Sequence, residues 1–203
     1  MKKITLLALV LLLVGLVAGV KAADYFTVGS IDDFNFYNEE VYKTGQAIVE
    51  NFNNDKINTP GLTITEVGGA GTFKLGYYEN IVDKDVNLPA GRYQVYNYAG
   101  GMNGFGGWFD LAGPGGPGSS IDVYVGATFV GNIPNTYAGQ FWGFFSNIGP
   151  FTSVTFVEGP GSAQETYQVV DLAICPAVPV PASLLLLGSG VLGLVGIGIR
   201  RKL

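Results

Sequence analysis

Three carboxylates near the end of the chain have the residue type and order that best suit a chemical role. Glu158, Glu165 and Asp171 fall on or between two segments with the alternating pattern of β-strands. Carboxylate oxygens are ligands that Ca²⁺ prefers, so these three side chains are a candidate calcium site. The favoured interpretation is that they are edge and loop carboxylates with ordinary hydrogen-bond partners. Calcium is the only cofactor that the sequence brings into consideration.

A second acidic stretch has the opening of a calcium-binding loop. Asp83-Lys84-Asp85-Val86-Asn87 follows a D-x-D-x-N pattern. The sixth position is Leu88 instead of the glycine that the sharp turn needs, and the twelfth is Gln94 instead of glutamate. This departure excludes an EF-hand and favours a solvated acidic loop.

The aromatic side chains offer a different chemistry. Trp108 lies beside a glycine-rich stretch, and a flat indole face can stack on the apolar face of a sugar ring. Aromatic residues of small β-domains also form the core, and this second interpretation is favoured for Trp142. Trp108 is left as either a core residue or a glycan-stacking residue.

Enzymatic machinery is not apparent in the sequence. Histidine is absent, which removes the commonest general base and metal ligand. The adjacent acid pairs Asp32-Asp33 and Glu39-Glu40 would point to opposite faces of a strand, so neither pair forms a convergent acid and base. We therefore expect a non-enzymatic protein, with a membrane-retained glycosidase as the weakest of the alternatives.

Charge is distributed unevenly along the chain. All 16 acidic residues lie between Asp24 and Asp171, where only five basic residues accompany them, giving this part a formal charge of about −11. Such a charge argues against nucleic acid as a partner. Cys175 is the only cysteine, so an intramolecular disulfide is excluded, and we expect it to be a small buried side chain.

The N-terminus has the pattern of a secretory signal peptide. Lys2-Lys3 precede the apolar run Ile4–Val20, and Val20-Lys21-Ala22 offers a cleavage site after Ala22. We expect residues 1–22 to engage the export translocon and signal peptidase. The alternative is an uncleaved N-terminal anchor.

The C-terminus combines prolines, a glycine-rich apolar run and a basic end. The proline-stiffened segment comprises Val178, Pro179, Val180, Pro181 and Ala182. An apolar segment, 183–199, follows and is expected to be a transmembrane helix, ended by Arg200, Arg201 and Lys202. A helix over Ala182–Ile199 would rise about 27 Å, just short of a hydrocarbon core of about 30 Å. This marginal length fits a processing signal as well as a permanent anchor.

Residues 177–203 resemble the PEP-CTERM sorting signal, in a form where Val180 replaces the glutamate between the prolines. The resemblance implies sorting by exosortase, a membrane protease of Gram-negative bacteria that make extracellular polysaccharide. It implies a protein exported across the inner membrane, anchored by its C-terminal helix, and then placed at the cell surface or in the biofilm matrix. Exopolysaccharide is the ligand class that this setting offers.

Between the two ends, residues 23–176 are predicted to form one β-domain. Short β-rich runs recur between Gly, Pro, Asn and Asp clusters, which indicates an antiparallel β-sandwich or jelly roll. The expected strands are Leu62–Val67, Thr72–Tyr78, Gly91–Tyr98, Ile121–Val125, Ala127–Ile133, Gln140–Phe145, Ser153–Glu158 and Thr166–Cys175. A helix is expected around Glu39–Phe52, and Gly100–Gly118 is expected to be a long loop interrupted at Trp108.

The stretch from Gly107 to Asp171 is also similar to the C-terminal half of β-sandwich domains found in PEP-CTERM surface proteins. Phe141-Trp142-Gly143-Phe144-Phe145 carries this similarity, and Asp171 matches the second of a usual aspartate pair. Val170 stands in place of the first, which weakens a metal role. The favoured function is thus a sorted, non-enzymatic surface or matrix protein, and the alternative is a carbohydrate-binding module displayed there.

Overall fold

The computed structural model describes residues 24–44, 46–69, 71–74, 76–82, 91–112, 118–161 and 165–177. The expected signal peptide, the calcium-like loop at 83–87, the sorting motif and the expected transmembrane helix lie outside these residues. Within them, no helix is long and apolar enough to cross a membrane.

The described chain is almost entirely antiparallel β-structure. Its strands are β1 (Tyr25–Val28), β2 (Ile48–Glu50), β3 (Leu62–Val67), β4 (Thr72–Lys74), β5 (Tyr77–Val82), β6 (Tyr93–Asp110), β7 (Ile121–Val125), β8 (Thr128–Ile133), β9 (Ala138–Ser146), β10 (Phe151–Glu158) and β11 (Glu165–Pro176). One short α-helix, α2 (Ile31–Phe36), continues into a π-helical turn, η2 (Tyr37–Val41). The all-β prediction is confirmed.

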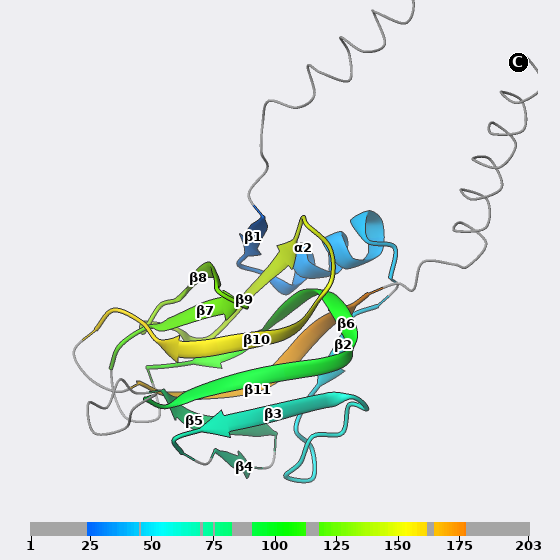
Figure 1. The fold of residues 1–203 in the computed structure, drawn as a ribbon. Coiled ribbons are helices and arrows are strands. Elements are labelled where there is room, and N and C mark those ends of the chain that lie inside the picture. The colour runs from blue at the N-terminus through cyan, green and yellow to red at the C-terminus, as the bar shows by residue number, and fades with distance from the viewer. Residues whose placement is uncertain are drawn as a thin grey trace, which may run out of the picture.

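The strands form two layers that share β6. The first part of β6 pairs with β3 and β10, and β7 and β8 continue that layer. The second part pairs with β11 and β9, to which β5, β4, β2 and β1 add. Figure 1 shows β6 curving at one end of the molecule, where it leaves one layer and enters the other. The result is a β-sandwich joined by a strand that belongs to both sheets.

The prediction of a loop over Gly100–Gly118 was wrong for its first half. Residues 100–110 form the second part of β6, at the centre of its layer. Phe105 and Phe109 point into the sandwich and are fully buried, so the alternation of a strand is present between the glycines. At Gly104 and Gly106 an added Cβ would meet the rings of Phe145 and Phe141. The glycines make room for aromatic rings of β9, and do not loosen the chain.

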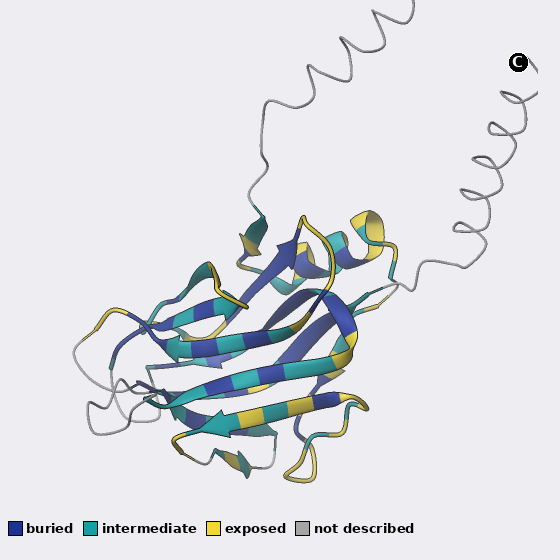
Figure 2. Ribbon diagram, in the orientation of Figure 1, coloured by how far each residue is buried: buried dark blue, intermediate teal, exposed yellow. Residues whose placement is uncertain are grey.

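The core between the layers is rich in aromatic side chains. Tyr96, Phe105, Phe144, Phe156 and Tyr167 are all fully buried, and buried residues alternate with more exposed ones along the strands (Figure 2). The hydroxyl groups of Tyr96 and Tyr167 are 2.7 Å apart, and the Tyr167 hydroxyl also donates to Gln94 Oε1 at 3.1 Å. The buried phenols therefore have partners, which removes most of the cost of burying them.

The helix lies N-terminal to its predicted position at Glu39–Phe52. Ser30 caps it by accepting a hydrogen bond from the Asp33 backbone N–H at 3.1 Å, and the acidic first turn suits a helix N-terminus. The β-branched Ile48-Val49 pair instead joins β11 as part of β2. The prediction missed this because the apolar positions of β2 were assigned to the helix.

The helix covers part of the outer surface of the β9–β6–β11 layer. Its one buried hydrophobic side chain, Phe34, packs with Phe141, Phe145, Ala173 and Cys175 in a second apolar cluster, separate from the sandwich core. The cysteine is buried as expected, and burial raises the pKa of its thiol to about 11. The helix therefore covers outward-facing side chains of β9 and β11 in this layer.

Most of the other strand predictions are confirmed. β3 and β7 have the expected bounds, and the tight hairpin at Gly126 joins β7 to β8. The run Thr72–Tyr78 is divided into β4 and β5, which pair around Gly76 at a positive φ of 88°. Glycine adopts this positive φ without strain, so Gly76 allows the chain to reverse between the two strands.

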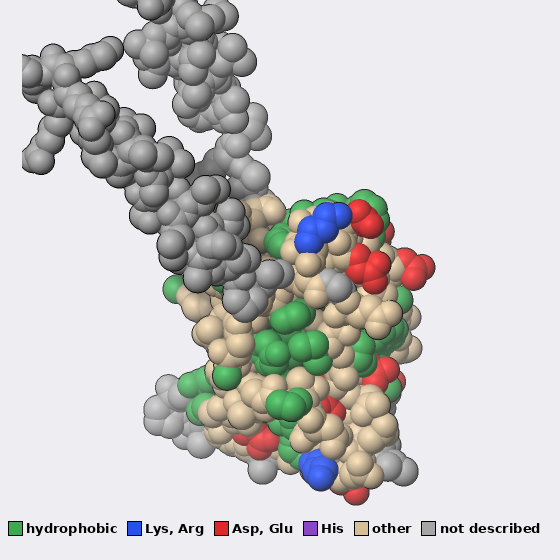
Figure 3. All heavy atoms as spheres, turned by 90° about the vertical axis from the view of Figure 1, so that its right-hand side faces the viewer, with side chains coloured by type: hydrophobic (Ala, Val, Ile, Leu, Met, Phe, Trp, Pro, Cys, Tyr) green, Lys and Arg blue, Asp and Glu red, His purple; other side chains and the backbone are tan. Residues whose placement is uncertain are grey.

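The described chain begins and ends at the same end of the sandwich. Phe26 of β1 pairs with Phe145 of β9, which pairs with Gly104 of β6, and Gly104 pairs with Cys175 of β11. One row of paired residues thus runs across the sheet from the first strand to the last. Figure 3 views the molecule from this side. Hydrophobic side chains gather near the centre of the visible face, and charged side chains lie mainly toward its margins.

Substitution of Gly106 by alanine is expected to destabilise the domain by roughly 1–3 kcal/mol, because over-packing against backbone cannot be relieved by a rotamer change. The added Cβ would lie 2.9 Å from both Gly143 Cα and Trp142 O. Urea unfolding followed by tryptophan fluorescence measures the change. Gly29→Ala is the matched control, since nothing lies within 4 Å of its Cβ position. Equal effects of the two substitutions would contradict the packing argument.

Candidate binding site beside Trp108

Trp108 lies on the outer surface of the second part of β6, packed against the apolar cluster that the helix covers. Its neighbour across β9 is Phe141, and the two rings meet edge to face with centroids 5.0 Å apart. On the β11 side, the register shift between Val169 and Leu172 places two residues, Val170 and Asp171, opposite Trp108. Trp108 is half-buried. It is therefore outside the sandwich core, whereas Trp142 is inside it, as predicted.

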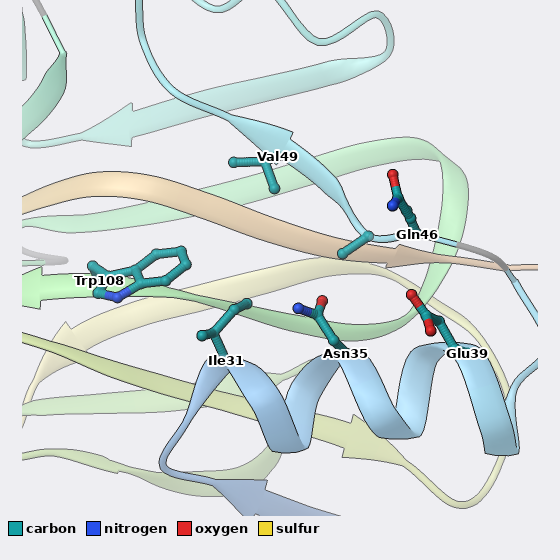
Figure 4. Close-up of a pocket in the computed structure, with 7 residues that line it drawn as sticks. Ile31, Asn35, Glu39, Gln46, Val49 and Trp108 are labelled. Atoms are coloured by element: carbon teal, nitrogen blue, oxygen red, sulfur yellow. The ribbon is translucent and has the colours of Figure 1, made fainter.

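A pocket of about 210 Å³ opens between the helix and β2, with Trp108 at one end. The helix contributes three side chains spaced four residues apart, which places them on one face. Figure 4 shows that face turned toward β2, with Trp108 near the start of the helix and Gln46 near its end. The labelled lining residues are Ile31, Asn35, Glu39, Gln46, Val49 and Trp108.

The pocket has an apolar part and a polar part. Trp108, Ile31 and Val49 supply hydrocarbon surface, and Asn35, Glu39 and Gln46 supply two amides and a carboxylate. Glu39 is the only charged side chain in the lining. The other member of its acidic pair, Glu40, points to Lys43 instead and forms an exposed ion pair at 2.9 Å. The pocket thus combines an aromatic ring, hydrogen-bond donors and acceptors, and one negative charge.

The structure does not bring the three predicted calcium carboxylates together. Glu165 and Asp171 are six positions apart on β11, a separation of about 20 Å along a strand. Glu158 ends β10, where it pairs with the buried Ile121. Across the described residues, no group of three His, Cys, Asp or Glu side chains is placed to hold a metal ion.

Two of these carboxyl groups, those of Glu165 and Asp171, have a pKa that is raised by burial. Asp171 lies opposite Trp108 in the ladder. Burial, followed by the charge of Glu50, raises the pKa of its carboxyl. Glu165 is fully buried, and among the described residues no group forms a well-aligned hydrogen bond with either of its carboxylate oxygens. Burial raises the pKa of Glu165 to about 7, against the smaller opposing effect of the Gly118 backbone N–H. The neutral form of Glu165 is therefore favoured in the fold.

Sequence reasoning found Trp108 but missed the helical residues beside it. Asn35 was not considered, and Glu39 was examined only as part of an adjacent acid pair. The spacing of Ile31, Asn35 and Glu39 is a signal that could have identified them. It was overlooked because the helix was expected to begin at Glu39.

Residues 177–202 match the PEP-CTERM protein-sorting motif. The chain carries a PEP-CTERM sorting signal. This confirms the resemblance drawn from Val178–Ala182 and the basic end, and the signal implies an exported surface protein subject to exosortase-dependent processing. Comparison with curated proteins gives no match.

Several solved structures align with part of the chain. A mutant of the carbohydrate-binding module CBM29-2 aligns with 65% of this chain and 95% of its own, at 13% identity and a TM-score of 0.45. CBM29_1 from Piromyces equi aligns with 64% of this chain and 91% of its own, at 12% identity and a TM-score of 0.44. The catalytic unit of a GH87 α-1,3-glucanase from Streptomyces thermodiastaticus aligns over 77% of this chain but 26% of its own, at 14% identity and a TM-score of 0.31. The β-sandwich assignment itself comes from the strand pairing described above.

The buried carboxyl of Glu165 should make the stability of the domain depend on pH. Its folded-state pKa of about 7 exceeds the ordinary value of 4.5, so the stabilisation is fully present below about pH 4.5 and is lost as the pH rises through 7. The full shift corresponds to at most about 3 kcal/mol. Thermal unfolding of the wild type should therefore shift to lower temperature between pH 4.5 and pH 8, and Glu165→Gln should reduce that shift. Glu40→Gln, at an exposed carboxylate, should leave it unchanged; parallel curves for all three proteins would contradict the assignment.

Proposed function

We propose that this chain is a non-enzymatic surface or extracellular-matrix protein whose β-sandwich is delivered by exosortase-dependent sorting. The export translocon and signal peptidase act on residues 1–22. The apolar segment 183–199 holds the exported chain in the inner membrane until the tail is processed. The domain then resides at the cell surface or in the matrix.

The observation that carries this proposal is where the fold ends relative to the sorting motif. β11 ends at Pro176, and the backbone N–H of Ala177 donates to the Gly101 carbonyl at 2.9 Å. The motif match begins at residue 177. The sandwich is therefore complete before the motif starts, so cleavage within or beyond Val178–Ala182 removes no strand from either layer.

The arrangement of acidic side chains supports a non-enzymatic role. Asp33 accepts a hydrogen bond from the Ser30 hydroxyl at the helix N-terminus, and Glu40 pairs with Lys43. The buried Glu50 carboxylate is held by the backbone N–H groups of the loop that follows it. Asp33 and Glu50 thus have structural tasks in helix capping and loop closure, and Glu40 forms a surface ion pair.

A C-terminal epitope tag placed after Leu203 should be lost from the mature extracellular protein in a host that has exosortase. It should be retained on membrane-associated protein when the exosortase gene is deleted, because the sorting signal is then not cleaved. Immunoblots of membrane and extracellular fractions measure this. A second tag just after Ala23 should remain on the protein in both hosts. Extracellular protein that keeps the C-terminal tag in the exosortase-positive host would overturn the proposal.

We propose carbohydrate binding as a second function, because Trp108 is half-buried on the outer surface and lines a pocket with polar side chains. An indole held by a T-shaped contact with the Phe141 ring loses little entropy when it binds a ligand. Sugar rings offer the apolar CH face and polar rim that such a surface matches. The exopolysaccharide of the producing cell is the ligand proposed.

Substitution of Trp108 by alanine should weaken polysaccharide binding by about tenfold or more, since an aromatic anchor at the centre of a site typically contributes at least about 1.4 kcal/mol. Native-gel retardation in polysaccharide-containing gels measures the effect. Phe129→Ala is the matched control, because this aromatic side chain is 53% exposed on β8 but does not line the pocket. Unchanged retardation of the Trp108 variant would exclude it as the stacking residue.

A further inference from the structure

The pocket beside Trp108 is also lined by polar side chains that could contact a ligand. We propose that the groove between the helix Ile31–Val41 and β2 is a subsite for one neutral pyranose ring of a polysaccharide. This inference rests on the second proposed function and adds to it the residues and the ligand class. Asn35, Glu39 and Gln46 are the hydrogen-bonding residues of the subsite, and Trp108 is its stacking residue.

Three separate elements build the groove. Ile31, Asn35 and Glu39 come from one face of the helix, Val49 comes from β2, and Trp108 comes from β6. The helix is fixed on the sheet by Phe34, which is fully buried against Phe141 and Phe145. β2 is fixed by its ladder with β11. Because both walls are held by packing or by backbone hydrogen bonds, the groove exists before a ligand binds.

The polar side chains of the groove are available to a ligand. In the described structure, Asn35, Glu39 and Gln46 make no side-chain hydrogen bond, although Asn35 is half-buried. Other polar groups nearby do have partners: Thr44 donates to the Asn38 side chain and backbone. Two amides and a carboxylate supply both donors and acceptors, which is what the vicinal hydroxyl groups of a sugar require.

The apolar and polar parts lie at opposite ends of the groove. Trp108 and Ile31 lie near the start of the helix, whereas Glu39 and Gln46 lie near its end (Figure 4). A pyranose ring placed between them would lay a CH-bearing face on the indole and direct hydroxyl groups toward the amides and the carboxylate. The volume of about 210 Å³ is below the roughly 300 Å³ at which pockets enclose drug-sized ligands, so one ring fits, with the polymer continuing outside.

Charge selects among sugars. Glu39 is negative and is the only ionised side chain in the lining, and the nearby Lys43 is paired with Glu40. A uronate or sulfated sugar would place a second negative charge against Glu39 with no lining cation to offset it. A neutral hexose or pentose meets no such cost. The groove therefore favours neutral polysaccharides over polyuronates.

The test uses the full chain in detergent with Trp142→Phe, which leaves Trp108 as the single fluorescent tryptophan. Fluorescence titration and native-gel retardation are run with neutral glucan, mannan, galactan and xylan, and with polygalacturonate and alginate. We expect at least one neutral polymer to bind and to shift the Trp108 emission. Asn35→Ala combined with Gln46→Ala should weaken that binding at least about tenfold. Asn53→Ala, at an exposed amide elsewhere on the surface, should have no effect.

The outcomes separate the subsite from the broader function. Loss of binding in Trp108→Ala with unchanged binding in the Asn35/Gln46 double variant would overturn the subsite but keep carbohydrate binding at Trp108. Binding of the polyuronates alone would overturn the charge argument and with it the proposed ligand class. Binding of none of the polymers would overturn both the subsite and carbohydrate binding, and would leave sorting through the tail unaffected. Glu39→Lys that gains polyuronate binding while Glu40→Lys does not would assign the selectivity to Glu39.

Discussion

The course of β6 through both layers is the constraint on which the rest of this structure depends. A single strand pairs with β3 and β10 before its bend and with β11 and β9 after it, so neither sheet can be assembled without it. The bend falls at Gly100 and Gly101, and Gly101 has a positive φ of 72° that side-chain-bearing residues rarely adopt. After the bend, the glycines at 104 and 106 allow the aromatic rings of β9 to lie on the strand. Trp108 reaches the outer surface only because this second part is a strand with a regular alternation.

Buried polar groups differ in whether they have hydrogen-bond partners. The phenols of Tyr96 and Tyr167 and the amide of Gln94 form one connected set between the sheets. Burial raises the pKa of both tyrosines, so these hydroxyls remain neutral donors and acceptors. Glu165 is buried at the start of β11 without such a network. The two regions show that this sandwich tolerates polar residues where strands supply partners, and tolerates a carboxyl in its neutral form where they do not.

Local patterns were sufficient to predict the strands with clear alternation and clear turn residues. Leu62–Val67 and Ile121–Val125 are examples, and the tail motif at Val178–Ala182 was recognisable for the same reason, since its information is contained in adjacent residues. The second part of β6 could not be predicted in this way, because its glycines are explained by rings of β9 some 40 residues further along the chain. The groove depended on the same kind of long-range information. Ile31 and Trp108 are distant in sequence, and only the position of the helix on the sheet brings them to one pocket.

The shared row of β1, β9, β6 and β11 has a mechanical consequence. β11 leads into the tail and lies between β6 on one side and β5 and β2 on the other, with antiparallel ladders along both edges. A pull on the tail acts along β11 and loads these ladder bonds in shear, many at once, because the bonds run perpendicular to the strand. Breaking them one after another would require a pull across the sheet instead. The strand that leads into the tail is thus held along both of its edges, so tension applied to it would be shared by many ladder bonds.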